Sequence, residues 1–98
     1  MDTTLADSST VVATEHQTSS QVGDEQVILD LEEGVYYGLN DVGARIWELV
    51  QKPVQVEEII HAIHTEYDVS VEECAADVKE LLGELQDHGL VRVTSNDA

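Results

Sequence analysis

Apolar residues occupy every second position in two short stretches of the chain, residues 26–31 and 35–39. Neighbouring side chains on a strand point to opposite faces, so this spacing predicts two strands, each with one buried face. The three residues 32–34, Glu-Glu-Gly, separate them and suit a hairpin loop, because glycine tolerates a positive φ. Residues 18–22 alternate more weakly and predict an additional strand. The alternating apolar positions are Val27, Leu29 and Leu31 in the first stretch and Val35, Tyr37 and Leu39 in the second.

A helical period follows the second stretch directly. Asn40 can cap a helix because its side chain accepts a hydrogen bond from a backbone N–H one turn later. The first predicted helix then runs towards Pro53, which cannot continue it. Its apolar residues, with Trp47 assigned to the core, are Val42, Ile46, Trp47, Leu49 and Val50.

Two more helices complete the pattern. Residues 56–67 place isoleucines on one side and predict the second helix. Ser70 and Glu73 form a capping-box pattern that opens the third helix, and Gly89 provides a C-terminal stop. The apolar stripe of the third helix steps by three or four residues and consists of Val71, Ala75, Val78, Leu82 and Leu85.

This order of elements predicts an α+β fold, with a small antiparallel sheet of two or three strands followed by three helices. The helices can be arranged as a winged helix-turn-helix, and they are needed to cover the apolar face of so small a sheet. We assign residues 18–93 to this domain. Residues 1–17 are polar and rich in serine and threonine, so they predict a flexible N-terminal arm, and residues 94–98 predict a flexible tail.

The charge of the chain limits its partners. The 98 residues include 21 acidic and 4 basic side chains, which give a formal net charge of −17. That charge repels phosphate backbones and disfavours nucleic acid as a partner. It fits a cationic partner, and it equally fits an acidic surface that only keeps the protein in solution. With one cysteine, no signal-peptide pattern and no apolar run long enough for a membrane span, we expect a cytoplasmic protein.

The sequence offers little catalytic chemistry. His61 and His64 lie one turn apart on the second predicted helix, with Glu57 one turn earlier, but a zinc site needs at least three ligands and no motif supplies them. Cys74 is surrounded by acidic residues, which raise the pKa of a thiol, so we expect it to pack beneath the third helix. We therefore expect no catalytic residues, no metal and no cofactor, and a protein that is not an enzyme.

A winged helix often reads DNA with one helix in the major groove. The third predicted helix has the wrong charge for that role, because it contains several acidic residues and a single basic one, Lys79. It suits a peptide rich in lysine or arginine. Its acidic residues are Glu72, Glu73, Asp77, Glu80, Glu84 and Asp87.

Taken together, residues 27–91 resemble the PqqD family over about two-thirds of the chain. Each matching piece is weak alone, and the combined spacing is more specific. The pieces are Val27-Ile28-Leu29-Asp30-Leu31, Gly34-Val35-Tyr36-Tyr37-Gly38-Leu39-Asn40, Gly43, Ile46-Trp47, Glu58-Ile59, Tyr67-Asp68-Val69, Asp77-Val78, Leu81-Leu82, Leu85 and Gly89-Leu90-Val91.

The resemblance implies a leader-peptide recognition protein for ribosomally made, post-translationally modified peptides. The free-standing chain with its YYGLN-x-x-G-x-x-IW pattern is similar to the recognition proteins of lasso peptide clusters, which pass the precursor to a leader peptidase and a cyclase. The alternative within the family is the peptide chaperone that serves a radical SAM enzyme in pyrroloquinoline quinone biosynthesis. Gln55 departs from the family pattern, which often has Thr or Ser there, and this predicts a frayed start of the second helix.

In that family the leader adds as a strand beside the third strand and lies next to the third helix. An open strand edge suits this binding mode, because its unpaired N–H and C=O groups can bond a guest chain. The margin of the third helix that faces the leader is left open. The expected acidic rim is Glu80, Glu84 and Asp87. The expected peptide-binding residues are Val35, Tyr36, Tyr37, Gly38, Leu39, Ala75, Val78, Lys79, Leu81, Leu82 and Leu85.

Two other classes of function stay as alternatives. One is a winged-helix regulator that works through protein contacts, and the other is a small enzyme or metal protein built on His61 and His64. The expected partners are therefore a precursor leader peptide and a modifying enzyme or leader peptidase, without nucleic acid or membrane. A monomer is expected, and a dimer is left open.

Overall fold

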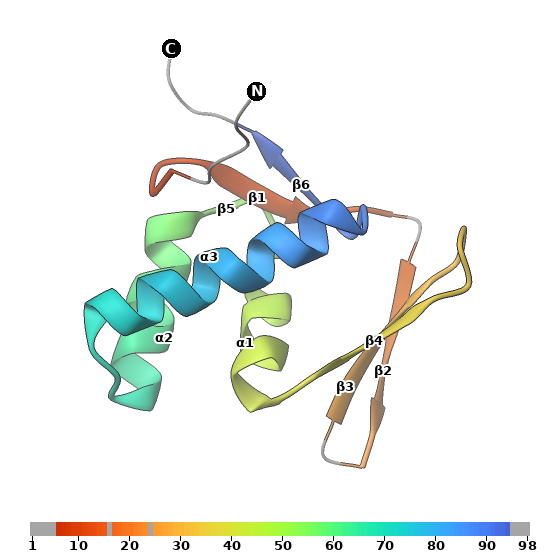
Figure 1. Ribbon diagram of the computed structural model, residues 1–98, viewed down its shortest axis with the longest axis horizontal. Coiled ribbons are helices and arrows are strands. Elements are labelled where there is room, and N and C mark those ends of the chain that lie inside the picture. Colours follow the sequence, from red (N-terminus) through yellow and green to blue (C-terminus); the bar gives the residue numbers. More distant parts are fainter. Residues whose placement is uncertain (1–5, 16, 24, 95–98) are drawn as a thin grey trace.

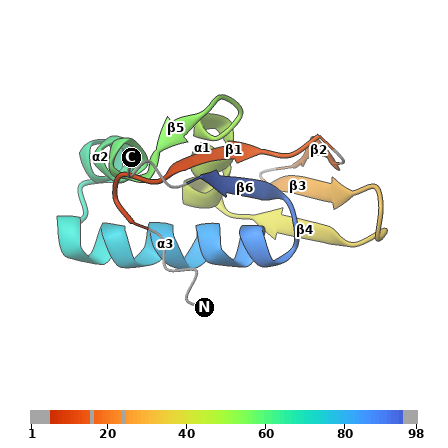
Figure 2. The same ribbon diagram turned by 90° about the horizontal axis from the view of Figure 1, so that it is seen from above.

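The structure is a computed structural model that describes residues 6–15, 17–23 and 25–94. Figure 1 shows the three helices grouped together, with one sheet extending to one side of them. In the turned view of Figure 2, α3 runs along one side of the molecule. In chain order the elements are β1 (Thr10–Ala13), β2 (Gln17–Val22), β3 (Glu25–Asp30), β4 (Tyr36–Leu39), α1 (Asp41–Leu49), β5 (Val54–Gln55), α2 (Val56–Tyr67), α3 (Val71–Asp87) and β6 (Val91–Thr94).

The strands form two antiparallel three-stranded sheets, in the orders β2-β3-β4 and β5-β1-β6. The first sheet and the three helices confirm the predicted α+β fold. The bounds of α2 agree with the predicted ones, and Gly89 follows α3 with a φ of 73°. One core joins the helices to both sheets, and its largest fully buried side chains include Val11, Ile28, Ile46, Ile59, Leu82 and Leu85.

The prediction of a flexible arm over residues 1–17 is wrong for Thr10–Ala13. These residues form β1, which pairs with both β5 and β6, and the side chain of Val11 is fully buried. The arm looked loose because an isolated apolar pair predicts no strand, while the partners of β1 lie more than 40 residues away in the sequence. Thr94 is likewise the last residue of β6, and residues 1–5 and 95–98 lie outside the described part of the chain.

The buried face of β3 is the opposite of the predicted one. A three-residue loop would place Leu29 opposite Tyr37, but the structure pairs Tyr37 with Ile28 and Tyr36 with Leu29. A shift of one residue turns every side chain of a strand to the other face. Ile28 is therefore fully buried, whereas the side chain of Leu29 is 38% exposed. Leu31 and Val35, which were predicted to face the core, are exposed as well.

A buried aspartate fixes this register. Asp30 is 5% exposed, and its side-chain Oδ1 accepts a hydrogen bond from the backbone N–H of Glu32 at 2.9 Å. The backbone N–H of Asp30 donates to the carbonyl of Val35, and its carbonyl accepts from Gly34, both at 2.8 Å. Gly34 has a φ of 73°, a conformation that glycine adopts without strain. The turn therefore begins one residue earlier than the sequence pattern predicts.

The start of α2 is held by the N-terminal segment. The first backbone N–H groups of a helix have no acceptor within the helix itself. Here the N–H of Val56 donates to the carbonyl of Ser9, and the N–H of Glu57 donates to the carbonyl of Asp7, both at 2.9 Å. The backbone N–H of Gln55 donates to Oε1 of Glu58 at 3.1 Å. These bonds satisfy donors that a helix start leaves open. They remove the reason to expect fraying at Gln55.

Candidate functional site

Strand β4 lies at the edge of its sheet among the described residues. Hydrogen-bonded and non-bonded residue pairs alternate along an antiparallel ladder. Because Asp30 bonds Val35, the next bonded pairs towards the helix involve Tyr37 and Leu39. Tyr36 and Gly38 therefore direct their backbone N–H and C=O groups away from β3. The open edge of β4 offers two donors and two acceptors to another strand.

The end of β4 is fixed by its junction with α1. The side chain of Asn40 accepts a hydrogen bond from the backbone N–H of Gly43 at 2.8 Å, as the predicted cap requires. A Cβ atom on Gly43 would lie 3.3 Å from Leu39 and from Oδ1 of Asn40. Only glycine allows this close approach without a shift of its neighbours. The strand and the helix therefore meet as one rigid corner.

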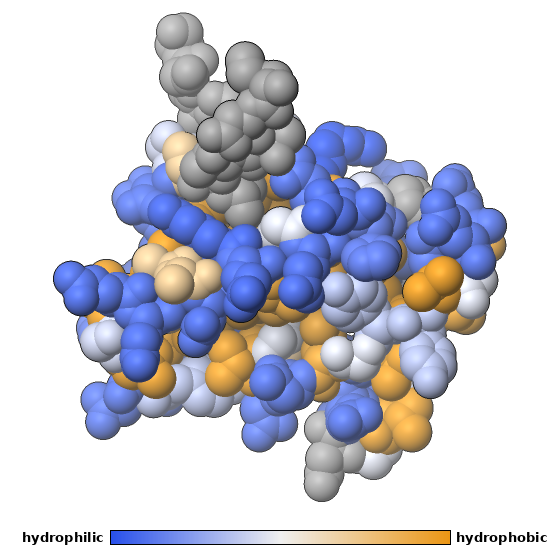
Figure 3. Space-filling model, in the orientation of Figure 1, coloured by the Kyte–Doolittle hydropathy of each residue, from blue (hydrophilic) through white to orange (hydrophobic). Residues whose placement is uncertain are grey.

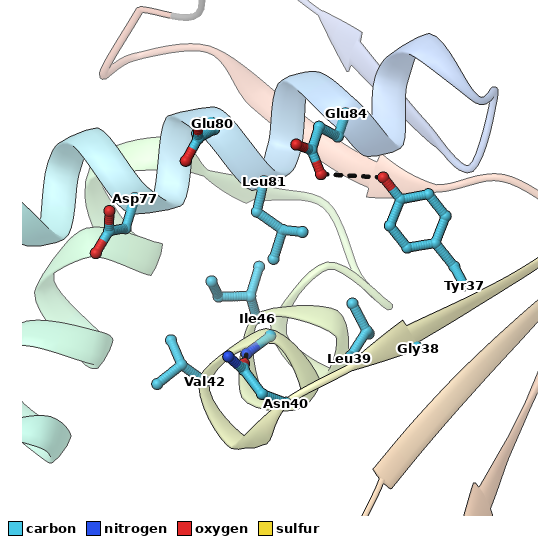
Figure 4. Close-up of a pocket in the computed structure, with 11 residues that line it drawn as sticks. Tyr37, Gly38, Leu39, Asn40, Val42, Ile46, Asp77, Glu80, Leu81 and Glu84 are labelled. Atoms are coloured by element: carbon cyan, nitrogen blue, oxygen red, sulfur yellow. Dashed lines mark hydrogen bonds between the residues drawn. The ribbon is translucent and has the colours of Figure 1, made fainter.

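A groove with a volume of about 350 Å³ separates β4 and the start of α1 from α3. Figure 4 shows its apolar floor and acidic side chains that come from α3. In Figure 3 apolar surface is visible beside the hydrophilic side chains that cover α3. The lining residues are Tyr37, Gly38, Leu39 and Asn40 at the end of β4, Val42, Gly43 and Ile46 from α1, and Asp77, Glu80, Leu81 and Glu84 from α3.

The α3 wall of the groove is negatively charged. Asp77, Glu80 and Glu84 line it, and none of them forms an ion pair within the described residues. Two of the basic residues have acidic partners elsewhere: Arg45 pairs with Glu48 and Glu66, and Lys79 pairs with Asp7 at 2.8 Å. The field inside the groove therefore favours a cationic side chain.

Tyr37 bridges the groove at one end. Its hydroxyl donates a hydrogen bond to Oε1 of Glu84 at 3.0 Å (Figure 4), and its ring packs against the ring of His88 in a T-shaped arrangement with a centroid distance of 5.0 Å. Burial raises the pKa of the Tyr37 hydroxyl, and the hydrogen bond and charge of Glu84 and the charge of Asp87 raise it further. The neutral hydroxyl thus ties β4 to α3 and closes one end of the groove.

The structure decides which margin of α3 faces this groove. Leu81 points into it (Figure 4), whereas Ala75 lines a separate hollow of about 230 Å³ next to α2. Lys79 reaches towards the N-terminal segment through its ion pair with Asp7. The three other predicted contact residues on α3 are buried and support the helix from behind: Val78, Leu82 and Leu85.

The other predicted site residues also fall into two groups, those that line the groove and those that lie outside it. The groove brings together Tyr37, Gly38 and Leu39 with Glu80 and Glu84. Val35 and Tyr36 are exposed on the hairpin outside it, and Asp87 lies close enough to Tyr37 to act on its pKa. The residues that sequence reasoning missed are Asn40, Val42, Gly43, Ile46 and Asp77. All five were recognised, but only as a helix cap, as apolar or acidic helix residues, or as part of the family pattern.

Cys74, His61 and His64 lie outside this groove. Cys74 is buried, as expected, and its thiol donates to the carbonyl of Ile60 at 3.4 Å. Burial raises the pKa of this thiol, and the charge of Asp77 adds to the effect. His61 and His64 line the hollow beside α2. Within the described residues no three potential ligands come together for a metal ion, and no helix is long and apolar enough to cross a membrane.

One family model and two solved structures are similar to this chain. The family model for coenzyme PQQ synthesis protein D, PqqD, matches residues 25–91. The structure of TbiB1 in complex with the TbiA(beta) leader peptide is similar, with a TM-score of 0.75 and 33% identity, over 89% of this chain and 98% of that chain.

A second solved structure, lasso peptide synthetase B1 complexed with the leader peptide, shares the fold. Its TM-score is also 0.75, with 22% identity over 84% of this chain and 96% of that chain. Comparison with curated protein sequences gives no match. The family model covers more than half of the chain, and the first structure is similar over nearly its whole length. The chain therefore belongs to the PqqD family.

Proposed function

We propose that this protein captures the leader of a ribosomally made precursor peptide by adding it as a strand to the open edge of β4. The observation that carries the proposal is the pair of outward-facing backbone positions, Tyr36 and Gly38, beside a groove bounded by α3. Support also comes from the two similar structures, which are complexes with leader peptides.

A guest strand in this position divides its side chains between two faces. Guest residues beside Tyr36 and Gly38 form the backbone hydrogen bonds, and their side chains lie on the outer face of the sheet. The alternate side chains lie on the face of Tyr37 and Leu39 and enter the groove. There a Leu-sized side chain would be buried against Leu81 and its neighbours, which contributes about 1.5–3 kcal/mol.

The acidic wall would act mainly on the rate of capture. Glu80 and Glu84 are both exposed, and charges at the rim of an interface change association rates and salt dependence more than final affinity. A leader with lysine or arginine near its groove-facing residues would be attracted to this wall. Val78, Leu82 and Leu85 would take part only indirectly, by holding α3 in place.

In this proposal the protein delivers the precursor peptide to modifying enzymes and catalyses no reaction itself. The protein would present the bound precursor to a leader peptidase and a cyclase of a lasso peptide pathway, in the cytoplasm where the precursor is made. The alternative is service to a radical SAM enzyme of pyrroloquinoline quinone biosynthesis, the pathway after which the matching family model is named. The acidic α3 argues against a DNA-binding regulator.

The test is a binding titration with the fluorescently labelled leader of the precursor encoded beside this chain. We expect a dissociation constant in the micromolar range or below. A Leu81→Asp variant, which places another charge on the groove floor, should bind at least tenfold more weakly. Tyr67→Phe, a change outside the groove, should bind normally. Absence of binding by the folded wild-type protein would refute the proposal.

A further inference from the structure

Neither the backbone conformation nor the packing of the described residues requires a glycine at position 38 of the edge strand β4. Glycine weakens a strand interior, because it has much conformational freedom and no side chain to pack. The glycines with positive φ are Gly23, Gly34 and Gly89, so the backbone at Gly38 suits any residue. A Cβ atom added there would meet only Oε1 of Glu25 at 3.9 Å, an ordinary contact. The space above Gly38 on the outer face of the sheet is therefore open to a side chain of a bound peptide.

The carboxylate of Glu25 lies over this gap. Gly38 is opposite Val27 in the ladder, and Glu25 lies two residues earlier on β3, so both side chains share the outer face with Gly38. Oε1 of Glu25 lies 3.9 Å from the position that a Cβ atom of residue 38 would occupy, so the carboxylate extends from β3 over β4. A shallow hollow next to it is lined by Glu25, Asn40, Asp41 and Val42.

The chemistry at this point favours a long cationic side chain. Neither Glu25 nor Asp41 forms an ion pair with any described basic residue. The bare backbone of Gly38 and the side chain of Val27 would lie beneath an aliphatic stem, and the Glu25 carboxylate would meet its charged head. Lysine and arginine combine such a stem with a terminal charge.

We infer that Gly38 and Glu25 select a guest whose residue beside Gly38 is lysine or arginine. The inference rests on the proposed strand addition, and it names one further requirement for the leader. It is separate from the acidic wall of α3, because Glu25 and that wall lie on opposite faces of the guest strand. Cross-strand pairs of opposite charge are favourable and like charges are unfavourable, so the choice between lysine and glutamate at this leader position should change affinity about fivefold.

The experiment uses the full chain and the leader of the precursor encoded beside it. A set of leader peptides carries lysine, and a second set glutamate, at each position in turn, and anisotropy titrations give the affinity ratio for each position. The proteins are wild type, Glu25→Gln, Glu25→Lys and the control Glu32→Gln. The control removes the same charge from an exposed residue in the β3–β4 turn, and so corrects for the net charge of the protein.

We expect one leader position whose lysine preference disappears in Glu25→Gln, reverses in Glu25→Lys and persists in Glu32→Gln. Circular dichroism should show all four proteins folded, since both glutamates are exposed. If the wild-type leader binds but no position depends on Glu25 more than on Glu32, the inference is overturned while strand addition stands. If the wild-type leader does not bind, the proposed function fails, and this inference fails with it.

Discussion

Replacing Tyr36 with proline removes a backbone N–H group of β4, so its effect can be compared with the loss of the side chain alone. The N–H of Tyr36 points away from β3, so Tyr36→Pro removes no bond of the sheet. Val35, the preceding residue, becomes restricted to extended conformations, which suit a hairpin arm. We therefore expect the variant to fold, with a free energy of unfolding within about 1 kcal/mol of wild type.

The effect on the bound leader should be larger. A guest carbonyl that faces Tyr36 would lose its donor and stay unsatisfied, which costs about 1–3 kcal/mol. A middle value of about 2 kcal/mol corresponds to roughly a 30-fold weaker dissociation constant. Tyr36→Ala is the matched control, because it removes the 72% exposed ring but keeps the N–H group.

The assay is anisotropy titration of the labelled leader against the three proteins, with urea unfolding to compare their stability. Tyr36→Ala reports the contribution of the ring, and the ratio between the two variants reports the backbone bond. Equal affinities for the proline and alanine variants, with both folded, would refute strand addition at this residue.

Three more predictions follow from the same geometry. Changing Glu80 and Glu84 together to Gln should slow leader association severalfold at low salt and hardly at all at high salt, as measured by stopped flow. If the association rate does not depend on salt, the acidic wall serves only to keep the protein in solution. The raised pKa of Tyr37 means that its contribution to stability is present below pH 10 and is lost as the pH rises through its folded-state pKa. In an absorbance titration Tyr37→Phe should therefore remove an ionisation that lies above the ordinary tyrosine pKa of about 10, and loss of an ionisation at or below that value would contradict this. Val11→Ala should lower the free energy of unfolding in urea by about 1–3 kcal/mol, and by more than Val12→Ala, whose side chain is only partly buried; equal effects would argue against β1 as a core strand.

Local signals predicted much of this fold. Asn40 and Ser70 cap α1 and α3 because their side chains satisfy nearby backbone donors, a relation that is readable within four residues. β1, β5 and β6 were missed, because each is short and is stabilised by partners far away in the sequence. The face of β3 was misassigned, because the buried carboxylate of Asp30 sets a turn that apolar alternation does not reveal.

The candidate site was predictable only in part. The strand at 35–39 and the acidic third helix were recognised, but their separation depends on tertiary packing. The corner at Gly43 brings Val42 and Ile46 to the groove, so residues assigned to the core of α1 also form its floor. The same packing turns Leu81 towards the groove and Lys79 towards Asp7, a choice that helical spacing alone leaves undecided.

Amide hydrogen exchange at single-residue resolution tests strand addition most directly. Recorded by NMR with and without saturating leader, it distinguishes the two sets of N–H groups on β4. Binding should slow exchange strongly at Tyr36 and Gly38, whose N–H groups face outward, and change it much less at Tyr37 and Leu39, which already bond β3. A leader that binds tightly while Tyr36 and Gly38 exchange as fast as in the free protein would contradict the account.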